Sequence, residues 1–412
     1  SSLGNGSAGF VTVLYWHKKI LIINAGSSSL KYKVFLGKNH KVICYGLCER
    51  IGIDGNFKIN CLNGKNFKTY EKKINIKDHT EAIDLILKQM KTHKIYDKIT
   101  EFSGIGHRVV NCGTAYTDSV LVNDKCLKVI KDHIPVAPLH NPHELKVIKI
   151  FMKKLPKVKN VAAFDNSFHS TIPEINYRYA IDKQLADKWE IRKFGYHGIS
   201  YKYITKQMEK ILHKKQVNLI VCHIGNGASI SAIKNSKSYD TSMGLTPLEG
   251  LVMGTRCGDM DPSVAVFLMR KGMNDEQIDE TLNKKSGLQG LVGSSDVRDV
   301  CSKLDKGNKD AKLALTMYVK RIAKYIVSYA NELEGKVDAV VFTAGVGENQ
   351  NYIVNETCKN IKLFNAEIND KKLIEKYNDN ILISSNNATY PIYRVRTDEE
   401  LMIANDVQNL TK

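Results

Sequence analysis

Three apolar segments, far apart in the chain, each run directly into a turn rich in glycine and small polar residues. The first, 20–23, precedes Asn-Ala-Gly-Ser-Ser-Ser-Leu-Lys at 24–31; the second, 219–224, precedes Gly-Asn-Gly-Ala-Ser; the third, 340–343, precedes Ala-Gly-Val-Gly-Glu-Asn. Glycine relieves the steric limits of a tight turn, and backbone N–H groups there donate to anionic oxygens. Each turn alone also fits an ordinary hairpin. Together they predict phosphate-binding turns at strand ends, the first two forming a repeated strand-turn-strand unit.

The rest of the chain alternates between strand-like and helix-like segments, which is typical of an α/β fold. The apolar runs predict strands at 20–23, 32–36, 42–48, 104–110, 161–164, 219–223, 228–232 and 340–343. Helical periodicity is clearest at 78–91, 142–154, 311–333 and 399–410.

Composition excludes several classes of protein. The length of 412 residues allows two or three domains, and 43% hydrophobic with 25% charged residues is ordinary for a globular protein. The nine cysteines are odd in number and contain no C-x-x-C pair, which predicts free thiols and a cytoplasmic protein. The sequence contains no run of about 18 apolar residues, so no membrane-spanning helix is predicted. Residues 1–18 lack the basic start of a secretory signal, so we interpret them as an N-terminal extension, native or left over from cloning.

The formal charge of +18 raises the question of nucleic-acid binding. The lysines of this protein are spread over the whole chain, mostly as pairs such as Lys153-Lys154 and Lys214-Lys215, without a long basic tract. This distribution predicts no nucleic-acid partner. A positive field of this kind suits small anionic ligands such as nucleotides and acyl phosphates.

A series of motifs resembles the acetate kinase family, within the acetate and sugar kinase, Hsp70 and actin superfamily. The similarity extends from about residue 19 to the C-terminus in the family's order. The matching stretches are NAGSSSLK (24–31), GHRVV (106–110), PLHNP (138–142), HIGNGAS (223–229), MGLTPLEGLVMGTRCGDMDP (243–262), SSDVRD (294–299), FTAGVGEN (342–349) and TDEE (397–400).

This resemblance implies two ribonuclease-H-like (actin-like ATPase) domains with an active-site cleft between them. The N-terminal domain would comprise residues 19–166, completed by the C-terminal helix within 397–412. The second domain, 167–396, would bind the nucleotide and form the interface of a homodimer. No Pro/Gly-rich linker marks either crossing.

Phosphoryl transfer to a carboxylate needs positive charge around the transferred group, and two arginines are candidates for supplying it. Arg108 ends a strand that contains Gly104 and Gly106, and Arg256 lies between Gly254 and Gly258. Asp165 ends an apolar strand, where an unpaired carboxylate would be costly to bury. The resemblance assigns catalytic roles to the set Arg108, Asp165, His197 and Arg256. After Asp165, Asn-Ser-Phe-His replaces the family's usual Thr-Ala-Phe-His.

The resemblance also implies binding residues for each ligand. For the nucleotide these are Lys31, His223, Gly225, Asn226, Gly227, Asp296, Val297, Arg298, Gly345, Gly347 and Asn349. For the acyl group they are Arg108, Val110, Leu139, Tyr196 and Pro247. Mg²⁺, or Mn²⁺ in its place, would be held by Asn24 and Glu399, consistent with a hard cation that keeps several waters.

Two local features qualify these assignments. Tyr196 replaces the phenylalanine usual in the family, which leaves the choice between acetate and propionate open. The cluster His140-Asn141-Pro142-His143-Glu144 lacks the spacing of a metal site, and we interpret it as a helix start with Asn141 as N-cap and Pro142 at the first helical position.

The predicted function is reversible, Mg-dependent and in-line transfer of the γ-phosphoryl group of ATP to acetate, giving acetyl phosphate and ADP. Acetate is already an anion, so the reaction needs charge neutralisation rather than a general base. A propionate or butyrate kinase of the same family is the main alternative. A non-enzymatic nucleotide switch of the actin or Hsp70 kind is disfavoured because all four catalytic candidates are present.

Overall fold

The computed structural model describes residues 18–412, so the predicted N-terminal extension lies outside the described residues except for Lys18. The chain forms two compact units. The first comprises residues 18–167 together with Asp398–Lys412, and the second comprises Phe168–Thr397. No helix in this described part is long and apolar enough to cross a membrane.

The first unit is built on one sheet with the strand order β5-β4-β3-β2-β1-β6-β8-β7. Its central strands β1, β2 and β3 are antiparallel neighbours, whereas β6 and β8 continue the sheet in parallel with β1. The strands are β1 (Lys19–Ala25), β2 (Leu30–Leu36), β3 (Val42–Glu49), β4 (Asn56–Asn63), β5 (Asn66–Lys72), β6 (Phe102–Val109), β7 (Val120–Leu121) and β8 (Asn160–Phe164).

The sheet of the second unit repeats this plan, in the order β11-β10-β9-β12-β14-β13. Strands β9, β10 and β11 are antiparallel, and β12 and β14 follow in parallel with β9. Both sheets therefore contain three antiparallel strands followed by two parallel ones, which is the expected ribonuclease-H-like arrangement. Its strands are β9 (Leu219–Ile224), β10 (Ala228–Lys234), β11 (Lys237–Thr241), β12 (Ala339–Thr343), β13 (Asn380–Leu382) and β14 (Ile392–Val395).

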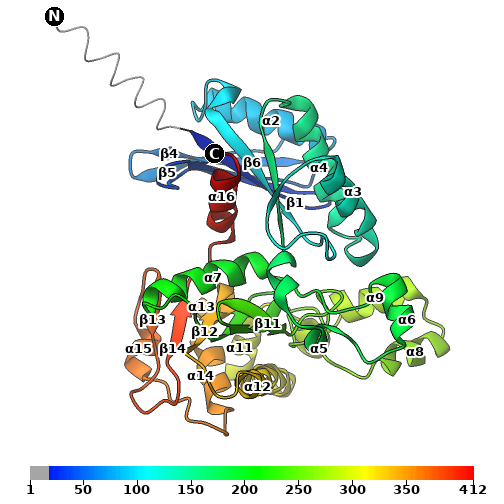
Figure 1. Ribbon diagram of the computed structural model, residues 1–412, viewed down its shortest axis with the longest axis vertical. Helices are drawn as coiled ribbons and strands as arrows, with labels where there is room; N and C mark the ends of the chain where they lie inside the picture. The colour runs from blue at the N-terminus through cyan, green and yellow to red at the C-terminus, as the bar shows by residue number, and fades with distance from the viewer. Residues whose placement is uncertain (1–17) are drawn as a thin grey trace, which may run out of the picture. The chain divides into compact units, whose positions relative to one another are not determined.

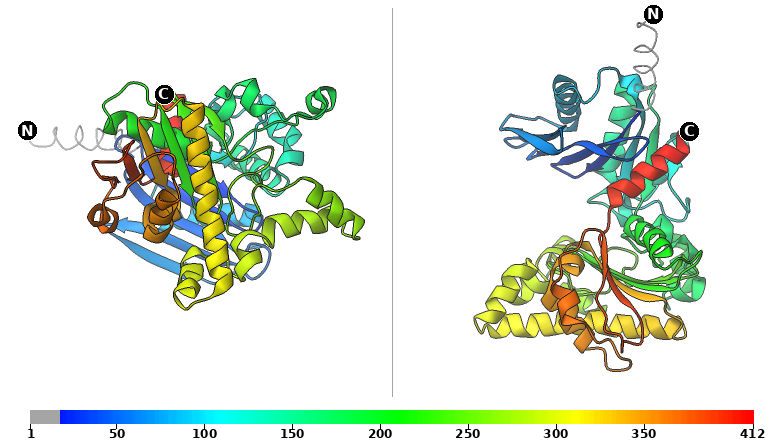
Figure 2. Two further views of the ribbon diagram at one scale, coloured as in Figure 1. Left: turned by 90° about the horizontal axis from the view of Figure 1, so that it is seen from below. Right: turned by 90° about the vertical axis from the view of Figure 1, so that its left-hand side faces the viewer.

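Helices cover both sheets (Figure 1). In the first unit they are α2 (His79–Thr92), α3 (Asp124–Asp132), α4 (Asn141–Lys154) and α16 (Glu399–Leu410), with 3-10 turns η1 (Ile99–Glu101) and η2 (Ile134–Val136). The turn η3 (Ser167–Thr171) begins at the passage into the second unit. The second unit contains α5 (Glu174–Tyr177), α6 (Lys183–Trp189), α7 (Gly198–Ile211), α8 (Ser263–Arg270), α9 (Asp275–Lys284), α10 (Gly287–Val292), α11 (Val297–Asp305), α12 (Lys309–Glu332), α13 (Ala344–Asn349), α14 (Asn351–Lys359) and α15 (Asp370–Ile374). The long α12 runs beside β9 and β10 (Figure 2).

Alternation of side chains along β6 decides which residues face α16. A Cβ added to Gly106 would lie 2.5 Å from Ile403 Cγ2, so the glycine lets α16 approach the sheet closely. The next residue, His107, points to the opposite face, where its ring packs on Phe151 of α4. Arg108 therefore returns to the face of α16, where its Nε lies 3.9 Å from Glu399 Oε2.

All eight predicted strands and four predicted helices are present, but two local predictions are wrong. Asn141 is the first residue of α4 rather than its N-cap, because its side-chain amide instead binds the backbone of Asn111 and Ile130. The third glycine segment does follow a strand, but it is helical rather than a turn: Gly345 lies in the short helix α13, which begins directly after β12. Glycines allow both geometries, so sequence alone does not separate them.

Candidate active site

The first glycine turn is a tight connection between β1 and β2. Asn24 and Lys31 are partners across the two strands, and the Gly26 N–H donates to the Ser29 carbonyl at 2.9 Å. Behind the turn, the buried His79 ring donates from Nε2 to the Gly26 carbonyl at 2.8 Å. The turn is thus held from behind while Lys31, 60% exposed, places its Nζ 3.3 Å from Glu400 of α16.

Arg108 and Asp165 form the charged centre of the first unit. The Arg108 guanidinium donates from Nε to Asp165 Oδ1 at 3.0 Å and from Nη2 to Oδ2 at 2.6 Å. The strands β6 and β8 are parallel neighbours, which brings their carboxyl ends and these two residues together. Asp165 is 2% exposed, and its charge raises the pKa of Arg108 further above the ordinary arginine value. The buried Asp165 carboxylate is thus paired with an arginine, which forms two charge-assisted hydrogen bonds with it.

The candidate metal ligands Asn24 and Glu399 both belong to the first unit. Glu399 begins α16, and its Oε2 lies 3.9 Å from Arg108 Nε. Burial raises the pKa of Glu399 to about 7, against the lowering effect of Arg108. The described residues contain no group of three His, Cys, Asp or Glu that could hold a metal. One carboxylate and one amide oxygen fit Mg²⁺, which takes few protein oxygens and retains water and phosphate ligands.

In the second unit, His197 and His223 stack with ring centroids 4.1 Å apart. His197 Nδ1 is 2.8 Å from Ser229 Oγ, which is itself 2.5 Å from the Tyr201 hydroxyl. His223 Nδ1 is 3.0 Å from Ser200 Oγ. Both rings are therefore oriented by hydroxyl groups, in the way that outer hydrogen bonds fix an imidazole tautomer.

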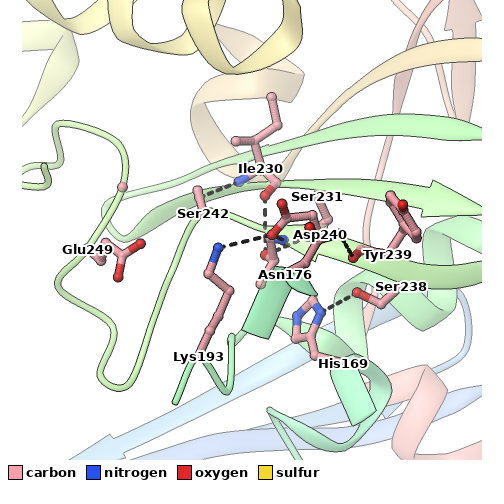
Figure 3. Close-up of polar contacts among 12 residues, drawn as sticks. His169, Asn176, Lys193, Ile230, Ser231, Ser238, Tyr239, Asp240, Ser242 and Glu249 are labelled. Carbon is pink, nitrogen blue, oxygen red and sulfur yellow. Dashed lines mark hydrogen bonds and ion pairs between the residues drawn. The ribbon is translucent and has the colours of Figure 1, made fainter. Parts of the chain in front are cut away.

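Neighbouring residues hold the backbone of His197 in an unusual conformation. His197 has a φ of 57°, in the left-handed region that non-glycine residues rarely adopt. The preceding Gly195 has a φ of 79°, and a Cβ there would lie 2.5 Å from Thr241 Cγ2. Buried His169 donates from Nε2 to the Tyr196 carbonyl at 2.8 Å. Its Nδ1 lies 2.6 Å from Ser238 Oγ (Figure 3). This packing over-determines a strained position, as is common at functional sites.

Beside these residues, a buried ion pair supports β11. Lys193 Nζ lies 3.0 Å from Asp240 Oδ1, and both side chains are largely buried (Figure 3). Asn176 donates to the Tyr239 carbonyl at 3.0 Å (Figure 3). These contacts tie the segment before α7 to the edge of the second sheet, and they were not foreseen because the residues lie far apart in sequence.

Arg256 lies against the second glycine turn. A Cβ added to Gly227 would be 3.4 Å from Arg256 Nη1, so the absent side chain leaves the guanidinium beside the turn backbone. Arg256 Nη1 donates to the Pro247 carbonyl at 3.0 Å. In the described part of the chain no ion pair joins Arg256 to a carboxylate, and burial lowers its pKa from the ordinary arginine value. The group is a desolvated cation suited to an anion.

A cavity of about 620 Å³ brings together most of the predicted nucleotide-binding residues. Asp296 caps α11 by accepting from the Arg298 N–H at 2.8 Å, which turns this segment toward the cavity. The lining residues are Gly225, Asn226, Gly254, Ser295, Asp296, Val297, Arg298, Gly345, Val346, Asn349 and Gln350. Gly254, Ser295, Val346 and Gln350 were not among the predicted binding residues, although each lies in or next to a motif that was identified.

Four predicted nucleotide-binding residues do not line this cavity: Lys31, His223, Gly227 and Gly347. The Gly347 carbonyl accepts from the buried Arg394 Nε at 3.1 Å, so this glycine supports α13 from behind. Lys31 belongs to the first unit, whereas the cavity belongs to the second.

The predicted acyl-binding residues are divided between the units. Val110 is 3% exposed and Leu139 is 56% exposed, both in the first unit. In the second unit Tyr196 is 1% exposed, and its hydroxyl donates to the Leu245 carbonyl at 2.5 Å, two residues before Pro247. The hydroxyl that distinguishes Tyr196 from phenylalanine thus has a backbone partner.

The fold and these groups define a class: an α/β protein of two ribonuclease-H-like units with glycine turns, a nucleotide-sized cavity and cationic side chains suited to phosphate. Residues 19–405 match the model of the acetokinase family. The acetate kinase of Mycoplasmoides gallisepticum is 47% identical over 395 residues, covering 96% of this chain and all of that protein.

Solved structures agree with this match. The crystal structure of Porphyromonas gingivalis acetate kinase has a TM-score of 0.89 and 38% identity, covering 96% of this chain and 100% of that one. A propionate kinase from Francisella tularensis has a TM-score of 0.88 and 38% identity, covering 95% and 100%. The chain belongs to the acetokinase family.

Proposed function

We propose that this protein is an acetate kinase, which reversibly transfers the γ-phosphoryl group of ATP to acetate and releases acetyl phosphate and ADP. The observation that carries the proposal is Arg256, a desolvated guanidinium beside a glycine turn and joined to no carboxylate by an ion pair in the described chain. A cation in this environment gains most from a phosphoryl group whose charge increases in the transition state. Whole-length similarity to acetate kinases supports the choice of acceptor.

The residues of each unit suggest a division of labour. In the first unit, Asp165 orients Arg108 so that the guanidinium can meet the acceptor carboxylate. In the second, the 620 Å³ cavity holds the nucleotide, and Arg256 and His223 contact its phosphates. The acceptor is already ionised and attacks directly, so the catalytic task of the protein is alignment and charge neutralisation.

We propose that His197 donates a hydrogen bond to the transferred phosphoryl group. If the Tyr201 hydroxyl donates to Ser229 Oγ, the Ser229 hydroxyl can donate to His197 Nδ1, which assigns the ring proton to Nε2. Asn24 and Glu399 would hold Mg²⁺, or Mn²⁺ in its place. When bound, the cation offsets phosphate charge.

A homodimer in the cytoplasm completes the proposal. The second unit exposes Val266, Phe267 and Met269 on α8, together with Leu313 and Met317 on α12. We propose that these side chains contribute to one apolar patch, since a contiguous exposed apolar patch is typical of an interaction surface. Sedimentation velocity would test the dimer: a single species with twice the chain mass is expected, and a monomer at micromolar concentration would contradict it.

A hydroxamate assay, which traps acyl phosphates, tests the function. The protein is incubated with ATP, Mg²⁺ and separately acetate, propionate or butyrate. We expect the strongest signal with acetate. A stronger signal with propionate would change the assigned acceptor, in keeping with the Francisella relative, and no signal with any acid would contradict the proposed activity.

A further inference from the structure

Glu144 is a buried carboxyl group that the proposed chemistry has not yet used. It lies in the first turn of α4 and is 2% exposed. The start of this helix is fixed by buried Asn141, whose side chain accepts from the Asn111 N–H at 3.3 Å and donates to the Asn111 and Ile130 carbonyls at 3.0 Å. Glu144 is therefore held in place by its helix.

The carboxyl group contacts the segment that carries Arg108. Glu144 Oε1 accepts a buried hydrogen bond from the Val110 N–H at 3.1 Å. Val110 follows Arg108 by two residues, immediately after β6 ends at Val109. The contact thus fixes the backbone where the strand leaves the sheet, next to the guanidinium and to the predicted acyl-binding residue.

The charges near Arg108 do not balance if every carboxyl group is ionised. Asp165 takes both guanidinium hydrogen bonds, and Glu399 lies 3.9 Å from Arg108 Nε. Glu144 is a third carboxyl group acting on the same cation. One positive charge cannot offset three nearby negative charges, two of them on the buried Asp165 and Glu144, so protonation of one carboxyl is favoured.

The environment of Glu144 makes it the group that keeps its proton. Burial, with a smaller contribution from the negative charge of Asp165, raises the pKa of Glu144 to about 8, despite the lowering effects of Arg108 and the Val110 N–H. The other ionisable group of β6 here, His107, is kept neutral because burial lowers its pKa to about 4. A protonated carboxyl still accepts from Val110 through its carbonyl oxygen.

We propose that Glu144 is a positioning residue for the carboxylate substrate: neutral, it holds Val110 in place and leaves the charge of Arg108 to the incoming anion, and ionised, it weakens that attraction. This inference rests on the proposed function. Loss of a single proton from Glu144 would then lower kcat/KM for acetate at alkaline pH. Glu144 would have this effect without contacting the reacting atoms.

The pH dependence of kcat/KM for acetate tests the inference, with ATP saturating and ADP release as the signal. In the wild type kcat/KM should fall about tenfold per pH unit above pH 8. Glu144→Gln keeps an acceptor for Val110 and cannot ionise, so its kcat/KM should match the wild type within about threefold at pH 7 and remain flat to pH 9. An equal alkaline fall in Glu144→Gln would overturn the proposal.

Two further variants separate positioning from general stability. Glu144→Ala removes the acceptor, and we expect KM for acetate to rise about tenfold or more while KM for ATP stays within about twofold. Glu101→Gln is the matched control, because Glu101 is a partly buried carboxyl of the same unit, paired with Lys19 before the start of β6. It should keep the wild-type alkaline fall. Equal rises in both KM values for Glu144→Ala would instead indicate a structural role only.

A stability measurement separates failure of this inference from failure of the proposed function. The folded state raises the pKa of Glu144, so its stabilising effect is complete below pH 4.5 and is lost as pH rises through about 8. The melting temperature of Glu144→Gln minus that of the wild type should therefore increase over this range. If this difference increases while no acyl phosphate forms, the proposed function is wrong but Glu144 is still protonated in the folded protein. A difference that stays constant with pH would contradict the protonation of Glu144.

Discussion

Arg108 and Asp165 form a bidentate ion pair at the carboxyl ends of two parallel strands, with nitrogen-oxygen distances of 3.0 and 2.6 Å. Asp165 is almost fully buried, whereas the Arg108 side chain is 24% exposed. The carboxylate is thus committed to the arginine and cannot easily act as a base. Its role is to hold one planar cation in one orientation.

Asp165→Asn should separate orientation from charge. The amide removes the carboxylate while conserving its shape, so Arg108 is released toward Glu399. We expect kcat to fall about 10²-fold, the cost of a misplacement of about 1 Å, with KM for ATP within about threefold.

A double variant and a surface control complete that test. Because the two residues act as a unit, Arg108→Ala with Asp165→Asn should be no slower than Arg108→Ala alone. Asp132→Asn breaks the exposed pair with Lys128 in the same unit and should leave kcat unchanged. Additive losses in the double variant would show that Asp165 has a role independent of Arg108.

Tyr196→Phe tests how its hydroxyl supports the predicted acyl-binding segment. The change leaves the Leu245 carbonyl without this donor, and we expect a loss of about 1 to 2 kcal/mol in unfolding free energy. Because Pro247 lies two residues beyond Leu245, the ratio of kcat/KM for propionate over acetate should also change, by about threefold or more.

Tyr96→Phe is the matched control for this substitution. The Tyr96 hydroxyl donates to the Leu87 carbonyl at 2.9 Å in the first unit. It should lower stability by a similar amount and leave the acid preference unchanged. The same change of preference in both variants would mean that Tyr196 has no specific influence on the acceptor.

His107 predicts a defined loss of stability in acid. Its buried ring binds Asn160 at 2.8 Å, and burial lowers its pKa to about 4 from an ordinary value of 6.5. The unfolded chain therefore takes up the proton first, and stability present above pH 6.5 is lost as pH falls toward 4, by about 3 kcal/mol in unfolding free energy.

The test compares His107→Gln with the wild type by thermal unfolding between pH 7 and 4. Glutamine can donate to Asn160 but does not titrate in this range. The wild-type melting temperature should fall more steeply than that of His107→Gln. Parallel curves for the two proteins would contradict a neutral buried His107.

Arg256→Ala should remove catalysis without loosening the fold. The deleted guanidinium is desolvated and paired with no carboxylate in the described chain, so the melting temperature should be unchanged or slightly higher. We expect kcat to fall about 10³- to 10⁵-fold, as for arginines that stabilise phosphoryl transfer.

Arg192→Ala serves as the control for Arg256. Burial also lowers the pKa of Arg192, which stacks on the Tyr177 ring 3.8 Å from its centroid. Its loss should reduce stability and leave kcat within about threefold of the wild type. If kcat falls equally in both variants, the effect belongs to the second unit's packing rather than to Arg256.

The sequence was most informative where a pattern repeats over a short range. Apolar runs located the central strands, and the motif residues around Gly225, Asp296 and Gly345 do line one cavity. The strand β5 was not predicted, because all of its residues are exposed and it pairs with β4 without an apolar run of its own. A strand with no buried face lacks the apolar and polar alternation that predicts a strand.

Long-range contacts are what sequence could not supply. The roles of His169 behind Tyr196 and of Glu144 behind Val110 depend on contacts between a side chain and a backbone group that lie 27 and 34 residues apart in sequence. Glu144 was considered only within a rejected metal motif. Its burial follows from how α4 packs, which no local spacing encodes.

Phosphorus NMR of the reaction tests the central claim most directly, since it distinguishes every phosphate product. With ATP, Mg²⁺ and acetate, the account predicts that acetyl phosphate and ADP appear in equal amounts, and that Arg256→Ala forms neither at a comparable rate. Formation of ADP with inorganic phosphate from the first time points, and no acetyl phosphate, would contradict it and would indicate a nucleotide hydrolase or switch instead.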